Sequence, residues 1–318
     1  MEHMEKNISG YVCEPVRLAR ISLWGGDNGF LSICRSIPGE IVIAFLLYFV
    51  LQRMMVPMIG SFICNAILLP LFGESLLDFM TPIQAWCEII MLAGFIAYMR
   101  FAQRRKFSAM GFIRRKWVLW YLLGLGCGLV LFSVSLLLSV ALTGGSVVYS
   151  GNISPALFLV ALSGWMVQGM AEEVDGRGYI FLSVSRTHKE YVGVLASGLF
   201  FGIIHINNPG ATFLSVLNTT LWGILFCLWM VAVENIWFIG ALHTAWNLSQ
   251  GNIFGVSVSG SAPGPSIFQG DLSGENSLLT GGAYGIEGNV VTTVVVLAMI
   301  AAALLIIQRK GKARKELG

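Results

Sequence analysis

Charged residues are scarce in this 318-residue chain: Asp, Glu, Lys and Arg make up 12% of it, while 56% is hydrophobic. A soluble domain is usually about 25% charged. The composition therefore excludes an ordinary soluble protein and favours one that crosses a membrane several times. The net charge of +3 is too small to indicate a nucleic-acid partner.

A secretory signal and a cysteine framework are also missing. The first 36 residues contain no apolar run of the ~7–15 residues that a signal peptide needs, so we expect the first long apolar run to be retained as a helix. The six cysteines are scattered singly, without a CxxC pair. This pattern favours neither a zinc cluster nor a disulfide framework.

Apolar segments long enough to span a bilayer, about 20 residues each, recur along the chain. We predict an all-α, polytopic membrane helical bundle with about eight transmembrane helices. The predicted spans are Ile41–Ile59, Ile83–Phe101, Trp117–Leu142, Ala156–Val184, Tyr191–Ile206, Phe213–Val233, Ile236–Leu248 and Val290–Ile307. The apolar stretch Ser61–Phe72 either extends the first helix or re-enters the membrane.

Basic residues are confined to alternate loops. The loop "RFAQRRKFSAMGFIRRK" holds seven Lys and Arg, and "SRTHKE" and "RKGKARKELG" contain further ones, whereas the loops between them contain none. Because positively charged loops stay in the cytoplasm, the N-terminus and the C-terminus are both predicted to be cytoplasmic.

One membrane domain accounts for most of the chain. We predict a cytoplasmic segment over 1–40, a single transmembrane domain over 41–308 and a basic cytoplasmic tail over 309–318. Within the domain, the Gly/Ser-rich segment 250–288 is predicted to be a mobile outer loop.

Ionisable groups inside the predicted spans are few, and each costs about 2.5–3.5 kcal/mol if it is Asp, Lys or Arg at the bilayer centre. Arg53 and Glu88 occur singly, and we interpret them as structural. Glu172, His205 and Asn247 each lie roughly 20–24 Å along their helices from the predicted cytoplasmic ends. Three different helices are thus predicted to bring polar groups to overlapping depths.

The fourth span carries four charges in the run "EEVDGR". Glu173 and Arg177 are spaced i, i+4 with Glu first, the better order for a helical ion pair, and we predict that pair. Glu172 lies about 100° from Glu173 around the helix and has no local cation. Its expected partner is His205 on the next helix.

His243 and Asn247 are one helical turn apart in "HTAWN" and project from one face. Both side chains can donate hydrogen bonds. Two donors that converge on one point are what an oxyanion site needs.

Three motifs follow one another in this region: "EEVDGR" fits EExxxR, "FGIIH" fits FxxxH and "HTAWN" fits HxxxN. In this order on three membrane helices, within residues 158–248, they resemble the CPBP family. That family comprises type II CAAX prenyl endopeptidases together with bacteriocin-processing and immunity-linked proteins, also called Abi.

The resemblance implies an intramembrane endopeptidase of a bacterial plasma membrane, acting on a peptide or membrane-anchored protein substrate. Glu172 and His205 would activate the attacking water. His243 and Asn247 would stabilise the oxyanion of the tetrahedral intermediate.

The role of a metal stays open at this point. Glu172, His205 and His243 could hold a zinc ion with an open position for water, as the family's metalloendopeptidase label implies. The motifs lack the HExxH spacing, which favours a metal-free, glutamate-type peptidase. The cofactor is therefore expected to be either a zinc ion or none, and Glu173 and Arg177 are expected to support the site.

Asp175 and Gly176 depart from the family, which usually has bulky apolar residues at these two positions. Asp175 lies about 60° from Glu172 on a helix and adds a second carboxylate, while Gly176 favours close helix approach. Two other functions are therefore kept: a catalytically weakened peptide-binding or bacteriocin-immunity membrane protein, and an ion- or proton-coupled transporter built on buried carboxylates and histidines.

Overall fold

The computed structural model describes residues 15–17, 36–72, 80–272, 274 and 276–317. Within them the chain is an all-α polytopic bundle of apolar helices that carries one small two-stranded sheet. Most of the predicted cytoplasmic segment 1–40 lies outside the described residues.

The first predicted span is one continuous helix built from several pieces. These are α3 (Ile37–Tyr48), α4 (Val56–Ile63) and α5 (Leu69–Phe72), joined by π-helical stretches at Phe49–Met55 and Cys64–Leu68. Ser36 caps the start of α3, and Pro38 stands in its first turn. The apolar stretch Ser61–Phe72 therefore extends the first helix, one of the two predicted alternatives.

The other predicted spans are helical as well. They are α6 (Met80–Cys87) with α7 (Ile89–Ala97), α8 (Trp117–Thr143), α9 (Pro155–Glu173) with α10 (Leu182–Thr187), α11 (Glu190–Ile204), α12 (Phe213–Val233), α13 (Ile236–Leu248) and α15 (Val290–Leu317). Among the described residues, five helical stretches are long and apolar enough to cross a membrane, and Glu190–Ile204 is a shorter apolar helix. The number of spans and the side of the termini stay predictions.

Side-chain caps explain where three of these helices begin. Ser154 before α9, Thr212 before α12 and Asn235 before α13 each accept a hydrogen bond from a backbone N–H of the first turn. Such caps satisfy donors that have no partner inside the helix. They fix the starting points of helices that carry much of the polar chemistry.

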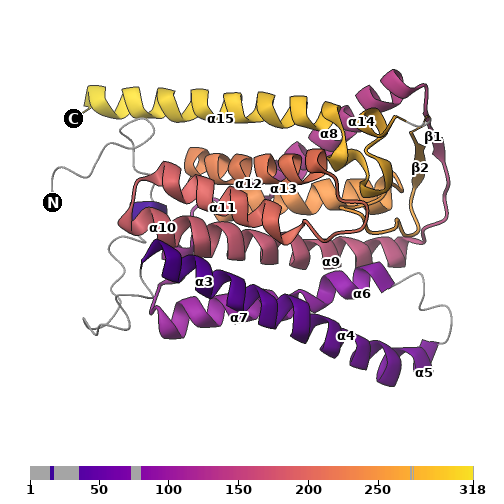
Figure 1. Cartoon of the computed structure of the whole chain (residues 1–318), viewed down its shortest axis with the longest axis horizontal. Coiled ribbons are helices and arrows are strands. Elements are labelled where there is room, and N and C mark those ends of the chain that lie inside the picture. The colour runs from indigo at the N-terminus through magenta and orange to yellow at the C-terminus, as the bar shows by residue number, and fades with distance from the viewer. Residues whose placement is uncertain (1–14, 18–35, 73–79, 273, 275, 318) are drawn as a thin grey trace.

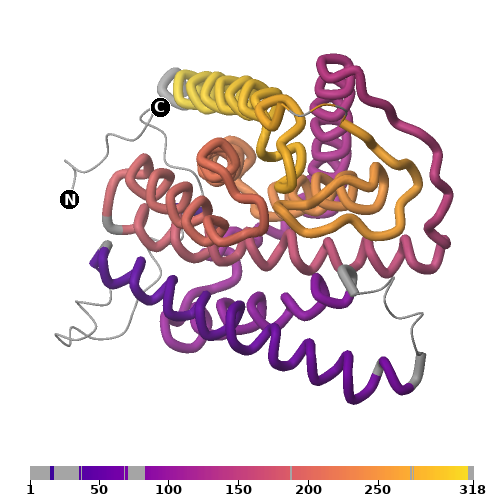
Figure 2. The backbone as a smooth tube through the Cα atoms, turned by 45° about the vertical axis from the view of Figure 1, so that its right-hand side comes forward, coloured from indigo at the N-terminus to yellow at the C-terminus, as the bar shows by residue number. Residues whose placement is uncertain are grey.

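The helices lie in layers (Figure 1). The helix α15 runs along one edge, the helices α9, α11, α12 and α13 lie in the middle, and the N-terminal helices α3, α4, α6 and α7 run along the opposite edge. Figure 2 shows the same separation after a 45° turn. In the middle layer α13 packs against α8 and α9, and α11 packs against α12.

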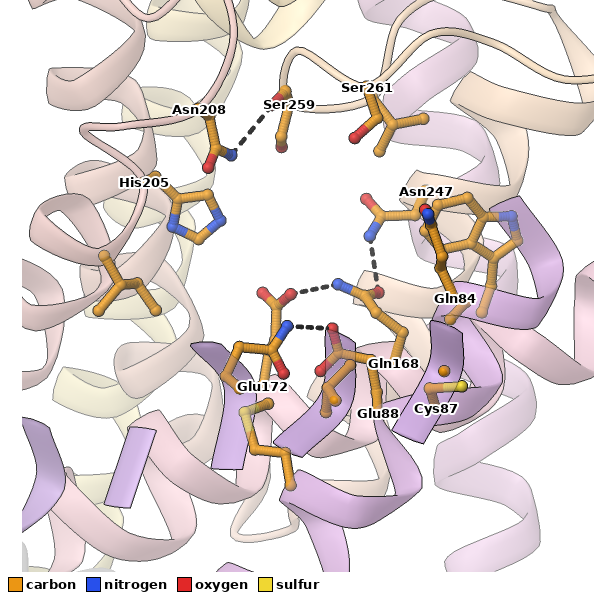
Figure 3. Close-up of a pocket in the computed structure, with 18 of the residues that line it drawn as sticks. Gln84, Cys87, Glu88, Gln168, Glu172, His205, Asn208, Asn247, Ser259 and Ser261 are labelled. Atoms are coloured by element: carbon orange, nitrogen blue, oxygen red, sulfur yellow. Dashed lines mark hydrogen bonds between the residues drawn. The ribbon is translucent and has the colours of Figure 1, made fainter. Parts of the chain in front are cut away.

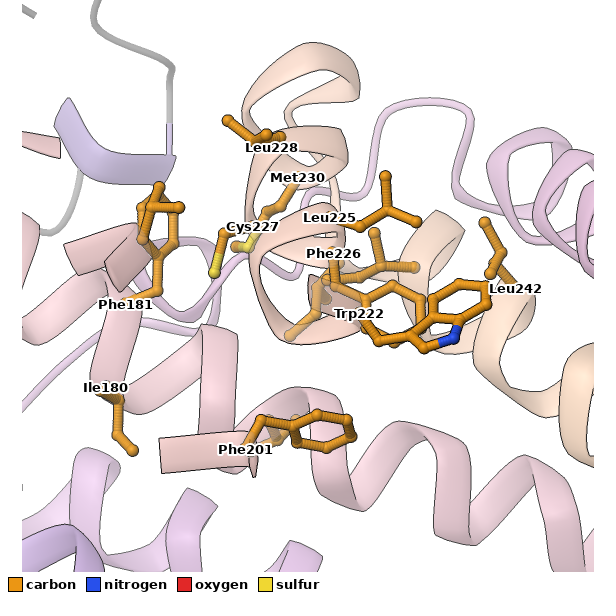
Figure 4. Packing of buried hydrophobic residues seen from close by; sticks show 14 of the residues in the cluster. Ile180, Phe181, Phe201, Trp222, Leu225, Phe226, Cys227, Leu228, Met230 and Leu242 are labelled. Carbon is orange, nitrogen blue, oxygen red and sulfur yellow. The ribbon is translucent and has the colours of Figure 1, made fainter. Parts of the chain in front are cut away.

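Aromatic side chains fill the space between α11, α12 and α13 (Figure 4). The rings of Trp222 and Trp246 are 4.5 Å apart, and the ring of Phe226 stacks on the imidazole of His243 at 5.2 Å, with an interplanar angle of 19°. The apolar core therefore reaches the polar residues of the third motif directly.

In its described residues, the segment after α13 contains regular elements and several buried side chains, and its mobility stays a prediction. It contains a π-helical stretch at Ser249–Ile253, the strand β2 (Phe268–Asp271) and the helix α14 (Ser277–Thr280), and β2 pairs antiparallel with β1 (Ser146–Tyr149). Tyr284 and Asn289 are fully buried. We call the described residues of the range 250–289 the lid.

Candidate functional site

A cavity of about 710 Å³ lies between the N-terminal helices and the middle layer, beneath the lid. Glu172 of α9, His205 at the end of α11, and His243 and Asn247 of α13 all line it. The close-up in Figure 3 shows Glu172, His205 and Asn247 around one space. The structure thus brings together the four residues that the sequence singles out as catalytic.

Glu172 is held by a neighbour that the sequence analysis missed. The side-chain amide of Gln168, one turn earlier on α9, donates a hydrogen bond to Glu172 Oε1, and Asn247 Nδ2 donates to Gln168 Oε1 at 2.9 Å. The i, i+4 spacing of Gln168 and Glu172 was the available signal. The other N–H of the Asn247 amide is left to bind a ligand.

The predicted ion pair between Glu173 and Arg177 is present and fully buried. Arg177 Nε lies 3.2 Å from Glu173 Oε2, and Arg177 Nη1 donates to Glu173 Oε1 at 3.2 Å. The guanidinium is also stacked over the rings of Phe201 and Phe226, at 4.5 and 4.8 Å from their centroids. Aromatic faces of this kind attract cations, so Arg177 ties α9 to α11 and α12.

Glu173 also orients the catalytic candidate His243. Its Oε1 lies 2.9 Å from His243 Nδ1, and since an ionised carboxylate can only accept, Nδ1 carries the proton. This leaves His243 Nε2 facing the cavity, 3.9 Å from Glu172 Oε2. Arg177, Glu173 and His243 therefore form one chain of contacts that ends at the site.

His205 stands at the point where α11 ends, and its ring is fixed by the helix itself. Its Nδ1 lies 2.7 Å from the backbone oxygen of Phe201, which can only accept, so the proton is on Nδ1 and the lone pair is on Nε2. A neutral imidazole in this tautomer can take a proton from a water in the cavity.

The direct pairing predicted between Glu172 and His205 is not formed. Within the described residues no hydrogen bond or ion pair joins them, and His243 is the histidine that contacts Glu172. In Figure 3 His205 lies across the cavity from Glu172. The rise per residue predicts how deep each group lies, but it contains no information on lateral distance.

Two glycines bring α8 close enough to hold α13 in place. A Cβ at Gly124 would lie 2.2 Å from the backbone oxygen of Phe238, and one at Gly128 would lie 2.3 Å from that of Leu242. The two positions are four residues apart, the spacing at which small residues allow close helix contact in membranes. The height and rotation of His243 therefore depend on this contact.

The N-terminal helices supply polar residues to the same cavity. Gln52, Arg53 and Glu88 line it, and the amide of Gln52 donates a hydrogen bond to Glu88 Oε1. Arg53 and Glu88 were interpreted as structural because each stands alone in its span. Only the three-dimensional packing places them in the wall of the same cavity as Glu172.

The lid contributes Glu287 to the cavity wall. Trp246 Nε1 donates to Glu287 Oε1 at 3.0 Å, while the backbone N–H and the hydroxyl of Ser259 donate to Oε2 at 2.8 and 2.6 Å. Ser259 and Glu287 both line the cavity. Burial raises the pKa of the Tyr284 phenol, and its hydroxyl bonds to Thr219.

Asp175 and Gly176 lie in the π-helical stretch Val174–Phe181, where α-helical phase no longer applies. Asp175 is fully buried, lacks a hydrogen-bond partner within the described residues, and is not among the described residues that line the cavity. A Cβ at Gly176 would meet the Ser197 hydroxyl at an ordinary 3.5 Å. The α11 residue Ser197 does approach this backbone, since its hydroxyl donates to the Gly176 oxygen at 2.7 Å, but the space would also admit a Cβ.

The predicted zinc ligands are not gathered around one point. Among the described residues, no group of three or more His, Cys, Asp or Glu side chains is placed to hold one metal ion. Glu172 and His243 are neighbours, but His205 lies across the cavity. The described residues therefore do not fit a zinc centre in this arrangement.

The fold and the site define a polytopic membrane protein with a polar cavity inside its helical bundle. Residues 154–249 match the family described as type II CAAX prenyl endopeptidase Rce1-like. The match supports the family predicted from the three motifs and covers the segment that carries them. That family suggests a protease in general, and the apolar helices support an integral membrane protein. A comparison with curated proteins found no match to the chain.

Proposed function

We propose that the protein is an intramembrane endopeptidase that hydrolyses a peptide bond of a membrane-associated or peptide substrate. The observation that carries this proposal is the convergence of Glu172, His205, His243 and Asn247 on one buried cavity. Amide hydrolysis needs an activated water and a stabilised oxyanion, and the four side chains include groups of both kinds.

Water activation is assigned to Glu172 and His205. The carboxylate is oriented by Gln168, and the imidazole offers the lone pair of Nε2 because Nδ1 is bonded to the backbone of Phe201. A water held between the two side chains would give a proton to one of them as it attacks the scissile carbonyl. Either group can then return that proton to the leaving amine.

Oxyanion stabilisation is assigned to Asn247 and His243. Asn247 has one amide N–H beyond the one given to Gln168. His243 already donates from Nδ1 to Glu173, so Nε2 donates to an oxyanion only when the ring carries two protons. The carboxylates of Glu172 and Glu173 beside the ring supply the counter-charge for this imidazolium.

The test is a peptide-cleavage assay on the purified full-length protein in detergent. The variants Glu172→Gln, His205→Ala and Asn247→Ala should each lower the rate by at least about 100-fold. His188→Ala, an exposed loop histidine outside the cavity, is the matched control and should keep full rate. Equal product from the wild type and all three site variants would remove the peptidase proposal.

A second measurement on the same sample addresses the cofactor. We propose a metal-free mechanism, so cleavage should survive exhaustive chelation and no zinc should be found by elemental analysis. Loss of cleavage on chelation, with recovery on adding zinc, would refute the metal-free mechanism and support the metalloprotease alternative.

The proposed location of the protein is a bacterial plasma membrane.

A further inference from the structure

The first long helix presents a cation to the cavity. Arg53 is exposed, lines the cavity and lies in the π-helical stretch Phe49–Met55. Such stretches are frequent at functional sites. Arg53 is the only Arg or Lys among the described residues that form the cavity wall.

Arg53 has no acidic partner within the described part of the chain. Its one hydrogen bond there is a long one, 3.4 Å, from Nη2 to the backbone oxygen of Ile204. The glutamates of the cavity are bonded to other donors. These are Glu88 to Gln52, Glu172 to Gln168, and Glu287 to Trp246 and Ser259. Most of the donors on the guanidinium are thus available.

The position of Arg53 points to a ligand. A charge inside a membrane helix is costly, and such residues usually mark a functional site. Ile204 directly precedes His205 in the chain, so the guanidinium lies beside the residue to which water activation is assigned. The planar fork of Arg matches a carboxylate in a two-point contact.

We propose that Arg53 binds a carboxylate of the substrate and so selects peptides that carry one close to the scissile bond. This inference rests on the proposed peptidase function. The carboxylate comes from one of two sources, a free peptide C-terminus or an Asp or Glu side chain. Both present the same planar anion to the guanidinium.

Another role for Arg53 would be to offset the negative charge of the cavity glutamates without touching the substrate. The two roles predict different substrate dependence. Charge compensation acts on every peptide alike, whereas a carboxylate subsite acts only on peptides that carry the anion.

The experiment measures binding of fluorescent apolar hexapeptide pools to the full-length protein in detergent, in the Glu172→Gln background so that nothing is cleaved. One pool has a free C-terminal carboxylate, a second has a C-terminal amide, and a third has the amide and one internal Glu. Arg53→Gln is compared with Arg53→Lys, which keeps the charge without the fork. The exposed Arg100→Gln, outside this cavity, is the matched control.

We expect Arg53→Gln to weaken binding of one carboxylate-bearing pool by about tenfold or more and to leave the neutral amide pool unchanged. Unchanged amide binding also shows that the variant is folded. The pool that loses affinity identifies the source of the carboxylate, Arg53→Lys should keep part of the preference, and Arg100→Gln should keep all of it.

Equal weakening of all three pools, no weakening, or no carboxylate preference in the Arg53-containing protein would overturn the subsite. Cleavage by the wild-type protein is measured separately. A carboxylate preference without cleavage would support the Arg53 subsite and refute the peptidase proposal. Cleavage without a carboxylate preference would support the peptidase proposal and refute the subsite.

Discussion

The buried contact between Glu173 and Arg177 allows a stability prediction with a definite magnitude. Both side chains are fully buried, and the closest atoms of the pair are 3.2 Å apart. Replacing Arg177 with Met keeps a long side chain but leaves the Glu173 carboxylate without its cation. Removing one partner of a buried pair costs about 3–5 kcal/mol of unfolding free energy.

The double variant Glu173→Gln/Arg177→Met should recover much of this loss. It removes both charges, and the amide oxygen of Gln can still accept the hydrogen bond from His243 Nδ1. We expect the double variant to be more stable than Arg177→Met alone by about 2 kcal/mol. This difference in unfolding free energy between the two variants measures the cost of the unpaired Glu173 charge and excludes the cost of the lost contact, which both variants share.

The assay is denaturant unfolding of the full-length protein in detergent, followed by tryptophan fluorescence. Arg114→Met, an exposed loop arginine, serves as the control and should unfold like the wild type. A double variant no more stable than Arg177→Met would refute the reasoning. The loss would then come from the packing of the guanidinium on the rings of Phe201 and Phe226.

Three further predictions concern other parts of the fold. Gly128→Ala should lower the free energy of unfolding by about 1–3 kcal/mol, because its Cβ would meet the Leu242 carbonyl. The control Gly126→Ala has open space around its Cβ and should unfold like the wild type, so equal unfolding curves for the two variants would contradict the prediction. Asp175→Leu should raise stability by about 1–3 kcal/mol in the same unfolding assay, because it removes a buried carboxylate that has no hydrogen-bond partner within the described residues; a loss would contradict it. Gln168→Leu should lower kcat by up to about 100-fold through misplacement of the catalytic carboxylate, with unchanged unfolding; a normal kcat would show that the link is dispensable.

Local physics made the helices predictable. The predicted spans Phe213–Val233 and Ile236–Leu248 coincide with α12 and α13, because apolar length and nearby capping residues define them. The ion pair between Glu173 and Arg177 was also predictable, since both partners lie on one helical turn.

Contacts between distant segments were not predictable in the same way. Arg53 and Glu88 each stand alone in the sequence, and only the packing of the N-terminal helices against α9 gives them a common cavity. The lid shows the same limit, because the pairing of β1 with β2 joins residues more than a hundred positions apart and Gly/Ser-rich composition does not predict it.

The cavity has walls of two kinds, and this division bears on how the protein can change over evolution. The proposed reacting groups all come from residues 154–249, whereas Gln52, Arg53 and Glu88 come from helices outside that segment. If the protein has the proposed function, substitutions in the N-terminal helices can alter which peptide binds while the proposed reacting groups stay in place. The substrate of such a protein can then change through substitutions in the N-terminal helices alone, while the segment 154–249 keeps the same reaction.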